Sequence, residues 1–283
     1  MPKLSIITVN LNNKAGLIDT AKSVVAQTWT DYEWIIIDGG STDESVDVIK
    51  EYAEKTDKLV YWCSEPDGGI YQGMNKGIEK ASGEYCWFLN SGDYAYKNTT
   101  LEEVFAVEFG EDIVYGDINY IYPEKYKIKY IYSIRNNKNK NPYLIKNWGL
   151  NSVIFHSSSI IKKKLFISLG YYNLYYSIAA DMEFFFKAIF KYSVRIKYID
   201  IIFSTFCYGG ISSNYKNLYI ERNKILLEYF PETYEKMILK LYIIKIINFI
   251  LPFKRIKNIF LRFKMFGVSK TINYYFSSII KRN

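Results

Sequence analysis

The N-terminal third of the chain alternates between short apolar runs and segments with helical spacing. The apolar runs are nearly continuous and rich in β-branched residues, which is typical of strands buried on both faces of a parallel sheet. The predicted strands are Leu4–Val9, Trp34–Ile37, Leu59–Cys63 and Tyr85–Leu89, and the predicted helices are Ala15–Gln27, about 43–54 and Ile70–Lys80. This alternation predicts an α/β fold with a doubly wound, mostly parallel sheet.

The pattern loosens after Asp93. The later predictions are a short strand at Ile113–Tyr115, strand or hairpin at 118–135, a helix at Asp181–Phe190, strand material at Val194–Phe206 and helix from Leu218 onward. Near Asp38, we expect Ser41 or Thr42 to cap the helix that follows.

Composition indicates an ordinary globular protein, since 49% of the 283 residues are hydrophobic and 23% are charged. Cys63, Cys86 and Cys207 are widely spaced and form no Cys-x-x-Cys pair, so we expect small buried side chains in a reducing compartment. The first residues lack the features of a secretory signal peptide, which predicts a cytoplasmic protein.

Charge is distributed very unevenly along the chain. Residues 1–124 carry 9 basic and 22 acidic side chains, whereas residues 125–283 carry 28 and 7. Residues 232–283 alone hold 11 basic and 2 acidic side chains, with apolar residues interleaved. Such a segment can lie on an anionic membrane surface, or it can pack on the protein's own core with a solvated basic face. We expect the membrane surface, at the inner face of the cell membrane, and no nucleic acid partner.

Two nucleotide-binding classes are disfavoured by the loop after the first predicted strand. It reads Asn10-Leu11-Asn12-Asn13-Lys14-Ala15-Gly16, without the Gly-x-Gly-x-x-Gly of dinucleotide-binding enzymes. The chain also lacks a P-loop Gly-Lys-Ser/Thr. A nucleotidyltransferase is a weaker alternative, because such enzymes usually carry a Gly-rich signature at this place.

Carboxylates recur where predicted strands end. They are Asp38, Asp67, Asp93 and Asp117, and Asp181 opens a later helix. In a parallel sheet the first four would gather at one edge, where mutual repulsion is costly unless they bind a cation or protons. Any one of them can instead serve a turn or a helix cap.

Several motifs together resemble the family 2 glycosyltransferases, which are inverting GT-A fold enzymes of polysaccharide assembly. In chain order they are SIITVNLNN, IIIDGGSTD, SEPDGGIYQGMNKGIEKASGEYCWFLNSGD, IVYGD, IAADMEFFFKA and GGISS. The branch they look most like transfers sugars in colanic-acid and capsular polysaccharides. The resemblance covers about residues 3–215.

The resemblance implies a donor side in the N-terminal half. Asp38 matches the acid that binds the base, and Asp67 matches the acid that contacts the nucleotide. We also expect Thr8, Asn12 and Asn75 on the side that binds the nucleotide-diphospho-sugar.

The resemblance also implies a divalent cation, Mg²⁺ or Mn²⁺, held against the donor diphosphate by Asp93. A full Asp-x-Asp motif would read through Ser91-Gly92-Asp93, which supplies one carboxylate, and Asn90 can add an amide oxygen. We therefore expect the donor phosphates to complete the metal's ligand shell.

In the second half, Asp181 matches the family's catalytic base. Glu183 stands two residues on in the same predicted helix and should point elsewhere, so we expect it to support the site. His156, the single histidine, is expected to contact the acceptor or the diphosphate, and Asp117 to support the acceptor side.

The sequence thus predicts residues 1–110 as a donor-binding half, 111–215 as an acceptor and base half of the same GT-A domain, and 216–283 as a basic amphipathic helical tail. The predicted activity is inverting hexosyl or N-acetylhexosaminyl transfer to a hydroxyl of a saccharide, expected to be lipid-linked. A non-catalytic nucleotide-sugar-binding or assembly-docking module of the same fold is the alternative.

Overall fold

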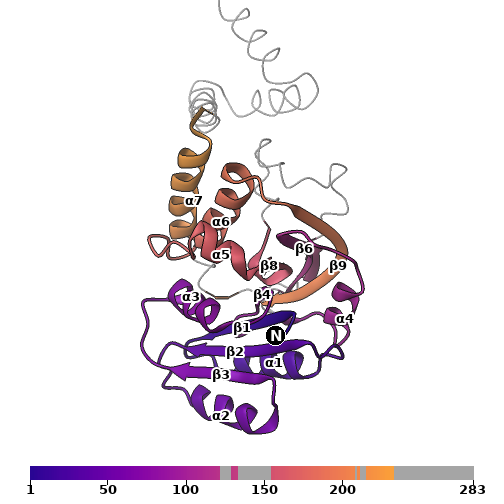
Figure 1. The fold of residues 1–283 in the computed structure, drawn as a ribbon. Helices are drawn as coiled ribbons and strands as arrows, with labels where there is room; N and C mark the ends of the chain where they lie inside the picture. Colours follow the sequence, from indigo (N-terminus) through magenta and orange to yellow (C-terminus); the bar gives the residue numbers. More distant parts are fainter. Residues whose placement is uncertain (122–128, 133–153, 208, 211–214, 233–283) are drawn as a thin grey trace, which may run out of the picture. The chain divides into compact units, whose positions relative to one another are not determined.

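The computed structural model describes residues 1–121, 129–132, 154–207, 209–210 and 215–232 (Figure 1). The chain divides into two compact units, Met1–Ile225 and Leu226–Asn283. The first unit therefore contains both predicted halves of the GT-A domain. All elements described below lie in it, apart from the last turn of the final helix.

The predicted order of strands and helices is confirmed for the N-terminal third, with ends that differ by a few residues. The strands are β1 (Leu4–Asn10), β2 (Tyr32–Asp38), β3 (Leu59–Ser64), β4 (Tyr85–Phe88), β5 (Tyr94–Ala95), β6 (Ile113–Ile121), β7 (Lys129–Tyr132), β8 (Ser159–Lys162) and β9 (Ile196–Cys207). The α-helices are α1 (Lys14–Val25), α2 (Ser45–Lys55), α3 (Ile70–Lys80), α4 (Thr100–Phe105), α5 (Lys163–Leu169), α6 (Ala180–Phe186) and α7 (Tyr215–Tyr229). A 3₁₀ turn, η4 (His156–Ser158), precedes β8, and a π turn, η5 (Lys187–Lys191), continues α6.

The strands form one mixed sheet in the order β3-β2-β1-β4-β8-β6-β9-β5, with β7 paired to β6 (Figure 1). β1 pairs in parallel with both β2 and β4, and β8 runs antiparallel between β4 and β6. The chain turns outward from β1 in both directions, so the carboxyl ends of β1 and β4 flank the switch point where α/β sheets bind ligands. The doubly wound, mostly parallel α/β prediction is confirmed.

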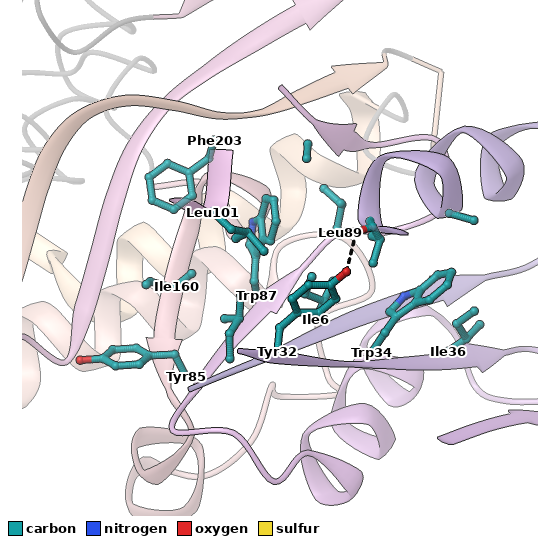
Figure 2. Close-up of a cluster of buried hydrophobic side chains, with 14 of the residues drawn as sticks. Ile6, Tyr32, Trp34, Ile36, Tyr85, Trp87, Leu89, Leu101, Ile160 and Phe203 are labelled. Atoms are coloured by element: carbon teal, nitrogen blue, oxygen red, sulfur yellow. Dashed lines mark hydrogen bonds between the residues drawn. The ribbon is translucent and has the colours of Figure 1, made fainter. Parts of the chain in front are cut away.

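Alternate side chains of the parallel strands point to opposite faces of the sheet. On one face, Ile6, Trp34 and Trp87 join the large apolar cluster drawn in Figure 2, which also holds buried residues of α1 and α2. On the other face, Gly77 lets α3 approach β1 so closely that an added Cβ would lie 2.4 Å from Ile7. The sheet is therefore a rigid middle layer, fixed on both sides, from which the loops at its edge project.

β6 differs from the prediction, because it does not end at Gly116-Asp117. The strand continues to Ile121 and pairs antiparallel with β7, which confirms the hairpin predicted within residues 118–135. A Cβ on Gly116 would lie 2.3 Å from the Ile201 carbonyl oxygen, and the register with β9 shifts at this point. The glycine marks a close approach of β9 to β6 at a bulge and not a strand end.

The start of α2 also differs from the prediction. Its N-cap is Glu44, in a left-handed conformation with φ 64°, and no side chain caps it. Ser41 instead donates its hydroxyl to Asp38, and Asp43 accepts from the Ser45 amide and hydroxyl. Ser41 thus serves the loop after β2, and Asp43 holds the first residue of the helix.

α7 ends at Tyr229, before Pro231, as the pattern indicated. The predicted basic tail beyond residue 232 lies outside the described residues, as do the loop at 136–142 and Ile211-Ser212 of the GGISS motif. Among the described helices, none has the length and apolar content needed to cross a bilayer. The three cysteines are free, with Cys86 buried and Cys63 and Cys207 half-buried.

Candidate active site

Polar side chains follow the carboxyl ends of four adjacent parallel strands. They are Asn10 at the end of β1, Asp38 at the end of β2, Asp67 just past β3, and Asn90 and Asp93 past β4. The predicted gathering of Asp38, Asp67 and Asp93 at one edge follows from this strand order. Asp117, in contrast, lies within β6, where it is 1% exposed and accepts a hydrogen bond from the Tyr198 hydroxyl at 3.0 Å.

Asp38 is fully buried and surrounded by hydrogen-bond donors. It accepts from Asn10 Nδ2 at 2.7 Å, from the Ser41 amide and hydroxyl at 2.8 and 2.6 Å, and from the Ser64 hydroxyl at 2.6 Å. Burial alone raises the pKa of Asp38, but the hydrogen bonds from Ser41, Ser64 and Asn10 outweigh it and the pKa falls below 3.8. The Asp38 carboxylate is therefore stabilised in its charged form, and it holds the Gly39–Thr42 loop in place.

Asn12 ties this loop to the one that follows β1. Its backbone amide donates to Ser41 Oγ at 2.7 Å, and its Oδ1 accepts from the Thr42 amide at 2.8 Å. Asn12 adopts φ 48°, a left-handed conformation that asparagine tolerates better than most residues. The two loops therefore form one connected surface at the strand ends.

Asp67 lies between two glycines of neighbouring segments. A Cβ on Gly39 would come within 3.3 Å of Asp67 Oδ1, and a Cβ on Gly73 within 3.3 Å of its Oδ2. Asp67 Oδ1 accepts from the Gly69 amide at 2.9 Å, which fixes the turn before α3. Asp67 is half-buried and lies beside the loop that Asp38 organises.

Thr8 and Asn75, predicted on the donor side, have other partners in the structure. Thr8 is fully buried and accepts from Trp34 Nε1 at 3.0 Å, inside the apolar cluster. Asn75 bridges to Tyr172, donating to its carbonyl at 2.9 Å and accepting from its amide at 3.0 Å. Both side chains fix elements of the fold around the site.

Asp181 and His156 form a pair that neither motif alone predicted. Nδ1 of His156 lies 2.8 Å from Asp181 Oδ2, and the two side chains are 16% and 17% exposed. Burial raises the pKa of Asp181, but the hydrogen bond and charge of His156 and the hydrogen bond of Tyr71 bring it below 3.8. The base candidate is thus an oriented anion.

Tyr71 is a site residue that the sequence reasoning missed, although it lies inside the GGIYQGMNKGI motif. Its hydroxyl lies 2.8 Å from Asp181 Oδ1 and 2.7 Å from the Ile178 carbonyl oxygen. Burial and the charge of Asp181 raise the pKa of Tyr71 well above 10, so the hydroxyl keeps its proton and can donate it. In the sequence, the only indication of this role was that a tyrosine with a polar hydroxyl stands on the apolar face of the predicted helix.

His156 also reaches the edge of the parallel strands. Its Nε2 lies 3.3 Å from Asn90 Nδ2, while Asn90 Oδ1 accepts from the Val9 amide at 3.4 Å. The contacts fit a neutral imidazole that donates from Nδ1 and accepts at Nε2. Burial lowers the pKa of His156, whereas the hydrogen bond and charge of Asp181 and the charge of Asp93 raise it, and the net result is a pKa above 6.5.

Asp93 is 6% exposed, and its environment differs from that of Asp38. Burial raises its pKa to about 7, and the charge of His156 and one backbone hydrogen bond offset this only in part. Among the described residues no group of three or more His, Cys, Asp or Glu could hold a metal ion. A lone buried carboxylate with a raised pKa fits a cation that brings most of its other ligands with it.

Glu183 lies apart from the Asp181 carboxylate, as its place in the helix predicted. It is 3% exposed, and its Oε1 lies 3.7 Å from Lys187 Nζ, one turn further along the chain. Asp181 faces His156 and Tyr71 instead. The structure thus brings Asp181, His156, Asn90 and Asp93 together, whereas Glu183 and Asp117 contact Lys187 and Tyr198 instead.

The sequence profile described as "Glycosyl transferase family 2" matches residues 5–170. The chain belongs to this family. The matched region contains β1 to β4, the loops that carry Asp38, Asp67 and Asp93, and His156. Asp181 lies beyond it.

A PGL/p-HBAD biosynthesis glycosyltransferase of Mycobacterium tuberculosis is 29% identical over 222 residues, covering 75% of this chain and 80% of that protein. S. aureus TarS 1–349 in complex with UDP has a TM-score of 0.59 at 19% identity, covering 80% of this chain and 65% of that one. The mannosyltransferase PcManGT from Pyrobaculum calidifontis, solved with GDP-Man and Mn²⁺, has a TM-score of 0.58 at 16% identity, covering 82% and 64%. The chain spans just under two thirds of these solved chains, and the likeness establishes a GT-A-like fold.

Proposed function

We propose that this glycosyltransferase moves a hexosyl or N-acetylhexosaminyl group, with inversion, from a nucleotide-diphospho-sugar to a hydroxyl of a saccharide acceptor in surface polysaccharide biosynthesis. The observation that carries the proposal is the Asp181 carboxylate, held ionised by His156 and Tyr71 beside the carboxyl ends of the parallel strands. A buried, oriented anion next to a donor-binding edge is suited to general base catalysis.

In the proposed reaction, the acceptor oxygen attacks the anomeric carbon from the face opposite the nucleotide diphosphate. The new carbon–oxygen bond forms as the bond to the diphosphate breaks, and the acceptor's proton passes to the Asp181 carboxylate. A single displacement of this kind inverts the anomeric centre. The Nδ1–H of His156 keeps Asp181 oriented and stabilises its charge before the proton arrives.

The donor side is proposed to lie along Asp38, Asp67 and Asn12. Asp38 and Asn12 shape the connected loops after β1 and β2, and half-buried Asp67 offers a carboxylate oxygen beside them. Thr8 and Asn75 would support this surface through Trp34 and Tyr172 without touching the donor. The UDP and GDP-Man complexes of the two solved relatives favour a UDP- or GDP-linked donor.

A divalent cation fits the surroundings of Asp93. The raised pKa of this carboxyl means that its anion lacks compensation in the described structure, and Mg²⁺ or Mn²⁺ would supply it. Asp93 would hold the cation, with Asn90 Oδ1 and the donor phosphates as further oxygen ligands. When bound, the cation would stabilise the negative charge that the leaving nucleotide diphosphate gains.

The basic tail is proposed to bring the enzyme to its acceptor. The 11 basic and 2 acidic side chains of residues 232–283 would hold the protein at an anionic membrane surface on the cytoplasmic side, where a lipid-linked saccharide is accessible. Partitioning onto vesicles with and without anionic lipid tests this, comparing the full chain with one that ends after Tyr229. Equal partitioning of the two proteins would refute it.

The decisive experiment combines donor binding with turnover. A thermal-shift panel of UDP- and GDP-sugars, with and without Mn²⁺, should identify the donor by a raised Tm. Asp181→Asn should then reduce transfer about 10²- to 10⁴-fold while the donor still raises the Tm. Asp57→Asn, a change at an exposed aspartate, is the matched control and should leave both unchanged.

The single-carboxylate metal site leaves one competing hypothesis, a non-catalytic module that binds a nucleotide-sugar or docks other assembly enzymes. Such a module would show the Tm shift with no transfer by the parent protein to any acceptor tested. Full turnover by Asp181→Asn would instead refute Asp181 as the base.

A further inference from the structure

The segment that leads into α6 has no capping residue of its own. Its N-cap is Ala179, which makes no side-chain capping hydrogen bond. Alanine is among the poorest residues at this position, because it offers no oxygen to the exposed amides. The amides of residues 177–179 lie at or before this N-cap and have no partner within α6, so they need an acceptor from elsewhere.

Glu221 of α7 supplies that acceptor from 42 to 44 residues further along the chain. Its Oε1 accepts from the Ser177 amide at 2.9 Å and from the Ser177 hydroxyl at 2.7 Å. Its Oε2 accepts from the amides of Ile178 and Ala179, both at 2.9 Å. One carboxylate thus binds every backbone amide from 177 to 179.

The electrostatics of Glu221 agree with this geometry. Burial raises its pKa, but the hydrogen bonds from Ser177, Ile178 and Ala179 outweigh burial and bring it below 4.5. Hydrogen bonds to an ionised acceptor are about twice as strong as neutral ones. Glu221 is therefore a charged clamp on an otherwise uncapped segment.

The clamped segment contacts the catalytic base candidate in two ways. Asp181 follows Ala179 by two residues on the same short stretch of backbone. In addition, the Ile178 carbonyl oxygen lies 2.7 Å from the Tyr71 hydroxyl, which lies 2.8 Å from Asp181 Oδ1. Movement of Ile178 and Ala179 would displace both the base and one of its hydrogen-bond donors.

We propose that Glu221 is a positioning residue for Asp181, holding residues 177–179 so that the base faces His156 and Tyr71. The expected effect on the rate depends on the proposed transfer reaction. The expected effect on the position of Asp181 depends only on the contacts described above. Glu221 touches no reacting atom. Loss of Glu221 should lower kcat, because it displaces the base candidate. It should leave the KM for the donor nearly unchanged, because the proposed donor-side residues Asp38 and Asp67 belong to other loops.

The kinetic test compares Glu221→Gln with the parent and with Glu228→Gln, which removes an exposed carboxylate from the same helix. In Glu221→Gln an amide NH₂ replaces one of the two acceptor oxygens. We expect kcat to fall about tenfold to a hundredfold, with the KM for the donor within about threefold. Ser177→Ala, which removes one of the four hydrogen bonds, should give a smaller loss in the same direction and covers the case in which Glu221→Gln does not fold.

A spectroscopic readout keeps the positioning role separate from the proposed activity. His156 is the single histidine, so one imidazole NMR signal set reports its Nδ1–H hydrogen bond to Asp181. Asp181→Asn provides the reference for a disrupted pair. Glu221→Gln should move the Nδ1 signals toward that reference, and Glu228→Gln should not.

The outcomes separate the two hypotheses. Parent-like imidazole signals in both Glu221→Gln and Ser177→Ala would overturn the positioning role, whatever the kinetics. Displaced signals with an unchanged kcat would support the positioning role and refute Asp181 as the catalytic base. A parent protein without turnover on any donor would refute the proposed function, and the imidazole signals would still decide whether Glu221 positions Asp181.

Discussion

Two carboxylates that interact with one imidazole have opposite pKa shifts. Asp181, at the start of α6, lies 2.8 Å from His156 and has a pKa below 3.8. Asp93 lies past the end of β4. The charge of the same histidine lowers its pKa, but burial still raises it to about 7. Both are shielded from solvent, so burial does not explain the difference.

The number of hydrogen-bond donors explains it. Asp181 accepts from His156, Tyr71 and the Met182 amide, and these donors together outweigh burial. For Asp93, only the charge of His156 and a single backbone hydrogen bond lower the pKa, and they do not outweigh burial. The protein has built one anion that it supports by itself and one that it leaves to be supported by a ligand.

The largest expected effect comes from Asp93→Asn in chelator-treated protein. Since the folded pKa of Asp93 lies above the ordinary 3.8, its contribution to stability is complete below about pH 4 and is lost as the pH rises through about 7. The variant should therefore exceed the parent in free energy of unfolding at pH 8, by an amount of the order of 3 kcal/mol. Urea unfolding between pH 4 and pH 8 measures the difference, which should shrink as the pH falls. Asp57→Asn is the control and should show no such pH dependence. A stability difference between Asp93→Asn and the parent that does not change with pH would contradict the raised pKa of Asp93.

The next effect tests the donors of Asp181. His156→Ala removes the Nδ1–H donor, so the pKa of Asp181 should rise toward its ordinary value and the acid limb of the pH profile of kcat/KM should move to higher pH. We expect about a tenfold to thirtyfold loss of kcat at neutral pH, as for a displaced general base. His156→Asn keeps an N–H group near the position of Nδ1 and should recover part of the lost kcat. Equal acid limbs in the parent and both variants would contradict the role of the histidine.

The smallest effect comes from Tyr71→Phe, which removes one neutral donor and keeps the ring. Because the Nδ1–H donor of His156 remains, we expect about a threefold loss of kcat and a smaller shift of the acid limb in the same direction. The ratio of kcat values and the two pH profiles measure it. A loss larger than that of His156→Ala would reverse the ranking of the two donors.

The sequence predicts the parallel half of the fold well, because strands buried on both faces appear as continuous apolar runs such as Leu4–Val9 and Trp34–Ile37. It predicts β6 less well, since Gly116 looks like a turn residue. Only the backbone of β9, at Ile201, reveals why a glycine is needed there. Close approach between strands far apart in sequence leaves no local pattern.

The same limit applies to the candidate site. Asp38, Asp67, Asp93, His156 and Asp181 could each be identified from the motif around it, but the hydrogen bond between His156 and Asp181 depends on how η4 and α6 pack. Tyr71 and Glu221 act through contacts 110 and more than 40 residues away in the chain. The uncapped Ala179 was a signal in the sequence, yet it indicates only that some acceptor is needed.

The origin of that acceptor in α7 has a consequence for biosynthesis. A chain emerging from the ribosome folds its N-terminal parts first. The strands that carry Asp38, Asp67 and Asp93 can assemble while Glu221 is still unmade, whereas residues 177–179 gain their clamp only after Glu221 has been translated. A nascent or truncated chain that stops before α7 would therefore hold the folded strand ends with Asp38, Asp67 and Asp93, while residues 177–179 beside Asp181 would lack their clamp.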